Sequence, residues 1–197
     1  MNPALAAGLI ILALAWGGPL PGLVAESFTA HMVLHMVVVG VAVPLLALGL
    51  AARWRPGAGR ASWAVVISLI DLIVVWGWHA PAPHEAARGS ALALAAEQGS
   101  FFAVSLAVWL LALGGREAGE DLAGAMALFF TSMHMTLLGA LLALTPRDLY
   151  HGLGGHGAHA VIDQQVGGAI MLAIGGVIYL GGALLLVGRL LRARVAP

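Results

Sequence analysis

Charged residues are scarce in this sequence, and lysine and cysteine are absent. It has nine basic and nine acidic residues among 197, and all nine basic residues are arginine. A soluble domain typically has about 25% charged residues, whereas this chain has 9%. The chain therefore has too few charged side chains to form the surface of a water-soluble protein. The net charge of zero, with no run of basic residues, excludes nucleic-acid binding. The absence of cysteine excludes disulfides and thiolate metal sites.

Long apolar segments dominate instead. Apolar residues make up 61% of the chain, and its mean hydropathy is +0.97. A membrane-crossing helix needs about 20 mostly apolar residues, and six segments qualify: residues 4–24, 28–51, 61–79, 91–113, 122–144 and 163–188. Glycine and proline at residues 17–19 and at Pro21 break the first segment, which predicts a short span or a span with a re-entrant end. We therefore predict one membrane domain over residues 1–197, an all-α polytopic bundle of about six helices.

The arginine positions predict the orientation of this bundle. In a six-span topology seven arginines fall on one side, and only Arg88 and Arg147 fall on the other. Because arginine is enriched in cytoplasmic connections, we expect both termini in the cytoplasm. The seven residues are Arg53, Arg55, Arg60, Arg116, Arg189, Arg192 and Arg194.

All eight histidines then fall in the outer half of the membrane or above it, and HMVLHM at residues 31–36 is their strongest pattern. His31 and His35 are four residues apart, so they share one helix face and can bind one metal ion. Met32 and Met36 repeat the spacing, and thioethers favour a soft ion such as Cu(I). The alternative is hydrogen-bonded histidines with packing methionines. We favour metal binding, because polar side chains inside a bilayer are functional by default.

His79 and His134 complete the predicted ligand set. His79 ends the third span in WGWHAP, at the same face as His31, and an interfacial side chain is the alternative. His134 lies about 16 Å below the outer end of the fifth span, where an imidazole needs a partner. Met133 and Met135 flank it, and at most one of them can point in the direction of His134.

Acidic side chains lie at similar depths. Glu97 is about 9 Å and Asp71 about 12 Å below the outer ends of their spans, and His35 is about 10 Å deep. Either carboxylate can orient an imidazole from outside the ligand shell or act as a proton partner. Asp163 is suited to N-cap the sixth span, and Met171 follows about 12 Å below it. The Gly-rich loop before the sixth span holds His151, His156 and His159. We expect these side chains to be solvated and mobile rather than to form a weak metal site.

Four pieces of sequence occur in a specific order and spacing between residues 30 and 171. They are HMVLHMVVVGVAVPLLALG, WGWHAP, LTPRDLY and DQQVGGAIM. Together they resemble the multi-pass CtaG-type cytochrome c oxidase assembly factors. Members of that family often have seven spans, and their fourth span tends to show Glu-His where this chain has Glu97-Gln98. The positions that the resemblance carries over are His31, His35, His79, Asp163, Gln164 and Met171.

The resemblance implies a non-enzymatic protein of the bacterial plasma membrane that delivers copper to a haem–copper oxidase. Its expected partners are the oxidase subunits, periplasmic copper chaperones and membrane lipid. The predicted ligands are His31, His35, His79 and His134. The soft or outer-shell groups are Met32, Met36, Met135, Met171, Glu97, Asp71, Asp163 and Gln164. Two alternatives remain: a zinc-dependent intramembrane hydrolase, and a haem or quinone cytochrome in which His35 and His134 would face each other.

Overall fold

Helices form nearly all of the structure, a computed structural model that describes residues 2–51, 60–115, 117–150 and 158–195. No strand occurs among these residues. The helices are α1 (Pro3–Gly17), α2 (Leu20–Leu23), α3 (Phe28–Met36), the π-helix η1 (Val37–Ala42), α4 (Val43–Ala51), α5 (Arg60–Trp78), α6 (Pro81–Gly89), α7 (Ala91–Leu113), α8 (Ala118–Leu144) and α9 (Ala158–Val195).

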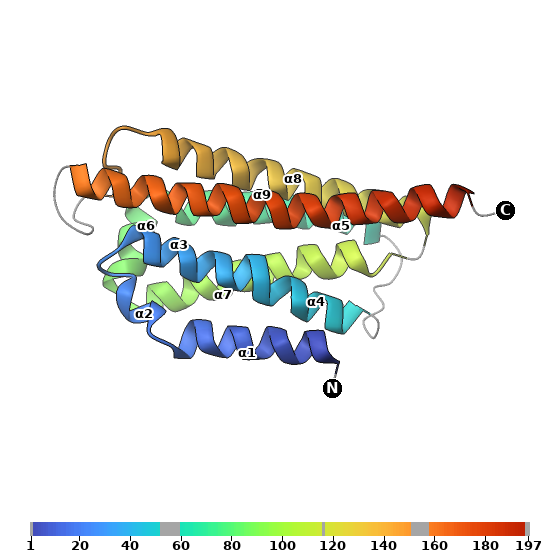
Figure 1. Ribbon diagram of the computed structural model, residues 1–197, viewed down its shortest axis with the longest axis horizontal. Helices are drawn as coiled ribbons and strands as arrows, with labels where there is room; N and C mark the ends of the chain where they lie inside the picture. The colour runs from blue at the N-terminus through green and yellow to red at the C-terminus, as the bar shows by residue number, and fades with distance from the viewer. Residues whose placement is uncertain (1, 52–59, 116, 151–157, 196–197) are drawn as a thin grey trace.

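Six helical stretches in the described part of the chain are long and apolar enough to cross a membrane. They run along a common axis, with α1 beginning and α9 ending at the same end of the bundle (Figure 1). Leu14, Ile73 and Val177 are each more than 60% exposed, as expected for side chains that face lipid rather than water. The predicted all-α membrane bundle is confirmed. The orientation remains a prediction, and Arg53, Arg55 and Arg116, on which it partly depends, lie outside the described residues.

The second span has the predicted bounds, but α3 and α4 are joined by the π-helix η1. Pro44 has no N–H to donate and its ring clashes with the carbonyl four residues earlier, at Gly40. Backbone bonding shifts to five residues, and Val43 N donates to Val38 O. This irregularity begins two residues after His35. The Tyr179 hydroxyl of α9 donates to the carbonyl of Val39 within it at 3.4 Å.

The start of the sixth span differs from the prediction. We expected residues 163–188, with Asp163 as N-cap, but α9 extends over Ala158–Val195 and Asp163 lies within its second turn. Its carboxylate caps another helix, α3, and accepts from Phe28 N at 2.6 Å and from Thr29 N at 3.1 Å. A free helix N-terminus leaves unbonded N–H groups that attract a carboxylate from any nearby element. The residue type of Asp163 therefore correctly predicted that it caps a helix, but it did not predict that the capped helix is α3.

Glycines allow α8 and α9 to approach closely. A Cβ on Gly168 would lie 2.5 Å from Ala143 N and 2.8 Å from Gly139 O. A Cβ on Gly139 would lie 2.6 Å from Leu172 N. The two backbones therefore touch at this crossing, as is common where small residues pack membrane helices together. Met135 of α8 and Met171 of α9 line the same cavity as Met36 of α3.

Candidate metal centre

Glu97 of α7 lies between the two histidines of HMVLHM. His31 Nε2 donates to Glu97 Oε2 at 2.9 Å, and His35 Nε2 lies 3.6 Å from Glu97 Oε1. One ligand atom from each of the three residues lies within 4.8 Å of the other two, the spacing expected around a metal ion. The sequence placed Glu97 outside the ligand shell. The structure places it in direct contact with both imidazoles.

The helix geometry of α3 brings the two imidazoles together. His31 and His35 lie on the same helix face, and their ring centroids are 4.4 Å apart. Both side chains and Glu97 are at most 2% exposed. His31 Nδ1, His35 Nε2 and Glu97 Oε1 have no hydrogen-bond partner. Buried polar atoms without partners are unfavourable, and a bound cation would satisfy those that face it.

The other ring nitrogen of His35 contacts Gln98. Gln98 Nε2 lies 2.6 Å from His35 Nδ1, and Trp16 Nε1 of α1 donates to Gln98 Oε1 at 3.4 Å. An indole N–H only donates, so Gln98 Oε1 is the acceptor and its NH₂ group faces His35. His35 Nδ1 therefore accepts, and the proton of the neutral ring lies on Nε2, towards Glu97. A metal ion that binds at Nε2 has to replace this proton.

His79 follows α5 directly and already presents an unprotonated nitrogen. Its Nδ1–H donates to the carbonyl of Val75 at 2.7 Å, which leaves Nε2 with a free lone pair and no partner. A ring N–H donated to a backbone carbonyl is the usual outer contact of a metal-bound histidine. The ring of His79 lies 5.8 Å from that of His35. The structure thus brings the first three predicted histidines together.

His84 was not among the predicted site residues, because it falls in the connection between the third and fourth spans. It lies on α6, a short helix with Pro81 at its start, and is completely buried. Its ring packs at a tilt against the rings of His31 and Tyr150, with centroid distances of 4.4 Å and 4.3 Å, and neither ring nitrogen has a hydrogen-bond partner. Burial lowers the pKa of His84 to about 2, and the neighbouring His31 contributes to this lowering, so the ring is neutral and able to bind a metal. The only sequence signal was the amphipathic pattern of α6, with His84 and Ala87 on its buried face.

His134 is placed in a separate pair. Its Nε2 lies 3.1 Å from Asp71 Oδ2, a carboxylate of α5. The predicted need for a buried partner is met by Asp71, and His134 is not part of the described group formed by His31, His35 and Glu97. His151 and His156 lie outside the described residues, and His159 is exposed at the start of α9.

The DQQ residues connect α9 to its neighbours. Gln164 accepts from Leu149 N at 2.9 Å and donates to Arg147 O at 3.2 Å. Gln165 donates to Thr145 O at 3.3 Å. These glutamine bonds join α9 to the end of α8 and to the segment between the two helices. Asp163 alone contacts the start of α3, so its cap is what holds the helix of His31 against α9.

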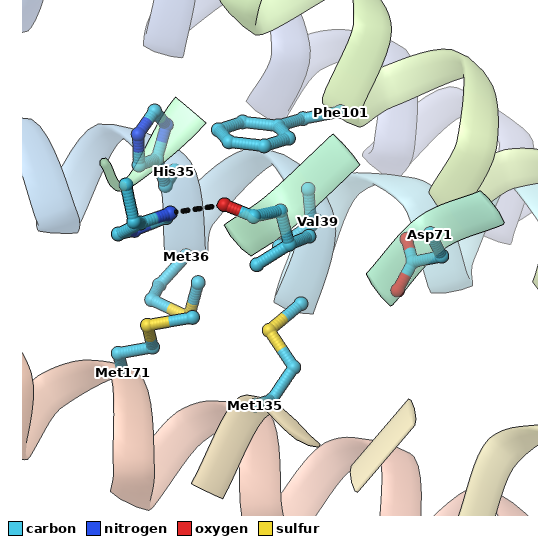
Figure 2. A pocket seen from close by; sticks show the side chains of 9 residues that line it. His35, Met36, Val39, Asp71, Phe101, Met135 and Met171 are labelled. Atoms are coloured by element: carbon cyan, nitrogen blue, oxygen red, sulfur yellow. Dashed lines mark hydrogen bonds between the residues drawn. The ribbon is translucent and has the colours of Figure 1, made fainter. Parts of the chain in front are cut away.

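Methionines lie below the histidines. Met36, Met135 and Met171 line a small cavity together with His35, His79, Asp71, Val39, Val75 and Phe101 (Figure 2). Of the two methionines beside His134, Met135 is buried at 1% exposure and Met133 is 53% exposed. Met32 is buried elsewhere, against Gly167 of α9.

Six apolar helices and a buried cluster of histidines around a carboxylate define a multi-pass membrane protein with a candidate metal centre. The model of the cytochrome c oxidase caa3 assembly factor family (Caa3_CtaG) matches residues 4–193. The chain belongs to this family, as the resemblance of its motifs indicated. No curated protein and no solved structure matches the chain significantly.

Proposed function

We propose that this protein binds copper at the centre formed by His31, His35 and Glu97 and delivers it during assembly of a cytochrome c oxidase. Its family consists of assembly factors for this oxidase. Its partners would be the oxidase subunits and periplasmic copper chaperones, at the outer face of the bacterial plasma membrane. The observation that carries the proposal is the position of one buried carboxylate between two buried imidazoles.

The residues around this group fit a metal ion. His79 and His84 each supply a ring nitrogen without a partner close to His31 and His35. Imidazole and carboxylate bind copper and zinc alike, and the nearby thioethers favour copper. A protein that delivers an ion must also release it. His31 and His35 also contact Glu97 and Gln98, so these side chains can exchange between the ion and their protein partners.

A zinc-dependent hydrolase would use a similar set of two histidines and a glutamate. Such an enzyme also needs a cleft for its substrate, typically about 300 Å³ or more. The cavity that touches His35 has a volume of about 10 Å³, enough for about one water molecule. A larger groove of about 470 Å³ reaches Gln98 but is not lined by His31, His35 or Glu97. The geometry therefore supports ion binding better than hydrolysis.

The ligand assignment is tested on purified protein by competition with a Cu(I) chelator. We expect His31→Ala, His35→Ala and Glu97→Gln each to weaken Cu(I) binding about tenfold or more. His159→Ala is the matched control, because His159 is exposed at the start of α9. Unchanged affinity in all three variants would overturn the assignment. Elemental analysis of the protein as purified separates copper from zinc and iron.

The assembly role is tested separately in cells. We expect a deletion strain to contain oxidase with less copper, and the wild-type chain to restore it. The His35→Ala chain, expressed at the same level, should not restore it. A fully metallated oxidase in the deletion strain would contradict delivery by this protein.

A further inference from the structure

The most informative feature outside the His31–His35–Glu97 group is the cavity below it. We propose that this cavity is a second position for copper, specific for Cu(I), with the thioethers of Met36, Met135 and Met171 and Nε2 of His79 as ligands. The inference rests on the proposed copper function and adds a sulfur site and a direction of movement to it.

Three separate helices supply the thioethers. Met36 comes from the end of α3, Met135 from α8 and Met171 from α9, and all three are at most 2% exposed. Figure 2 shows their side chains projecting toward the same space. Of the other methionines in the described chain, Met32 is buried against Gly167 of α9, and Met126 and Met133 are 56% and 53% exposed. The three methionines at the cavity therefore differ in their surroundings from the other methionines of the described chain.

The same cavity holds polar atoms that nothing in the described structure satisfies. His79 Nε2, His35 Nε2 and Asp71 Oδ1 have no hydrogen-bond partner, and each of these residues lines the cavity. Leaving such atoms without a partner in an apolar interior is unfavourable. A cation in the cavity would bind the lone pair of His79, and the carboxylate of Asp71 would lie nearby to balance its charge.

Ligand chemistry selects the oxidation state. Thioethers are neutral, soft donors that favour Cu(I), whereas Zn²⁺ and Cu²⁺ prefer nitrogen and oxygen. The cavity volume of about 10 Å³ admits an ion without its water shell. A singly charged ion loses less hydration energy than a doubly charged one on entering such a site. The His31–His35–Glu97 group, with a carboxylate ligand, is the less selective of the two positions.

His35 connects the two positions. Its Nε2 lies 3.6 Å from Glu97 Oε1, and the same residue lines the methionine cavity. Its ring also lies 5.8 Å from that of His79. Cu(I) can thus exchange ligands between the upper group and the cavity through His35 without a change in oxidation state. The cavity is the deeper, more selective end of this path.

The test is X-ray absorption spectroscopy of the full-length protein loaded with Cu(I), combined with chelator competition. We expect sulfur scattering from copper in the wild type, and its loss in the triple variant Met36→Leu, Met135→Leu, Met171→Leu. Leucine conserves volume and apolar character, so the fold should be retained. The matched control is the double variant Met126→Leu, Met133→Leu, which changes only lipid-facing methionines and should keep the sulfur signal.

The outcomes separate this inference from the proposed function. Loss of sulfur scattering and about tenfold weaker Cu(I) binding in the triple variant, with Zn²⁺ binding unchanged, supports the cavity site. Copper bound only by nitrogen and oxygen in the wild type, with the triple variant unchanged, overturns the cavity site and leaves the proposed function intact. No copper binding by the wild type overturns both. Wild-type and triple-variant proteins with matching thermal unfolding show that any loss is not due to misfolding.

Discussion

The carboxylate of Asp163 accepts a hydrogen bond from the backbone nitrogen of Phe28 at 2.6 Å and so joins α9 to the first turn of α3. The Ser27 hydroxyl also donates to Asp163, at 3.0 Å. His31 follows Phe28 by three residues, less than one helical turn. The position of the first candidate ligand therefore depends on a residue more than 130 positions away in the chain.

Loss of this cap should destabilise the protein and loosen the centre. We expect Asp163→Ala to lower the free energy of unfolding by about 1–3 kcal/mol, because backbone N–H groups lose a charged acceptor. Asp163→Asn, which still accepts one bond, should lower it less. Thermal unfolding followed by tryptophan fluorescence measures both. Glu85→Ala, which removes an exposed carboxylate of α6, is the control and should stay within about 0.5 kcal/mol of wild type.

The crossing of α8 and α9 predicts opposite effects for two glycines of one helix. Gly168→Ala places a Cβ 2.5 Å from Ala143 N, so the backbones must separate, and we expect a loss of about 1–3 kcal/mol. Gly181→Ala meets nothing within 4 Å and should stabilise α9 by up to about 1 kcal/mol. Thermal unfolding of the two variants side by side is the measurement. Equal effects would show that α8 and α9 do not touch at Gly168.

The contact between Gln98 and His35 predicts how the affinity for metal can be raised. In Gln98→Glu the new carboxylate accepts a hydrogen bond from a protonated His35 Nδ1, which leaves the lone pair of Nε2 free for metal. We expect about tenfold tighter Cu(I) binding, the size typical of contacts that orient a ligand. Gln98→Leu keeps the volume and removes the contact, and should weaken binding by a similar factor. If the Glu variant binds no more tightly than the Leu variant, Gln98 does not control the proton on His35.

His84 can be a ligand or only a packed ring, and a shape-conserving substitution separates these roles. His84→Phe keeps an aromatic ring packed against His31 and Tyr150 but removes both ring nitrogens. We expect thermal unfolding close to that of wild type and Cu(I) affinity lowered about tenfold. Chelator competition and fluorescence-detected unfolding are measured on the same preparation. An affinity equal to wild type would assign His84 to packing.

The second span shows which structural features a local sequence pattern can predict and which it cannot. The spacing of His31 and His35 predicts one helix face, because side chains four apart always neighbour each other in a helix. The structure confirms this contact, with ring centroids 4.4 Å apart. The same segment contains Pro44, yet the π-helix that it produces was not predicted. Whether a proline kinks a helix or widens it depends on partners such as the Tyr179 hydroxyl, which comes from α9.

Glu97 and Asp71 show that the estimated depth of a residue in the membrane does not predict which side chain it contacts. Both were placed at depths similar to that of His35, which left open which carboxylate would meet which histidine. Glu97 contacts His31 and His35, and Asp71 contacts His134. Depth along a helix fixes one coordinate only, and the rotation of each helix and the identity of its neighbours are set by packing. His84 was missed for the same reason, since an amphipathic connection does not indicate what its apolar face covers.

By itself the sequence determined that this chain is a bundle of membrane helices, and it predicted that the histidines lie towards one side. Scarcity of charge, six long apolar runs and the positions of arginine are local properties that the bilayer acts on directly. The tertiary structure decided which polar groups meet: Glu97 with two imidazoles, Asp163 with the start of α3, and three methionines at one cavity. These pairings depend on close backbone contacts such as that of Gly139 with Gly168, which bring distant segments within reach of each other.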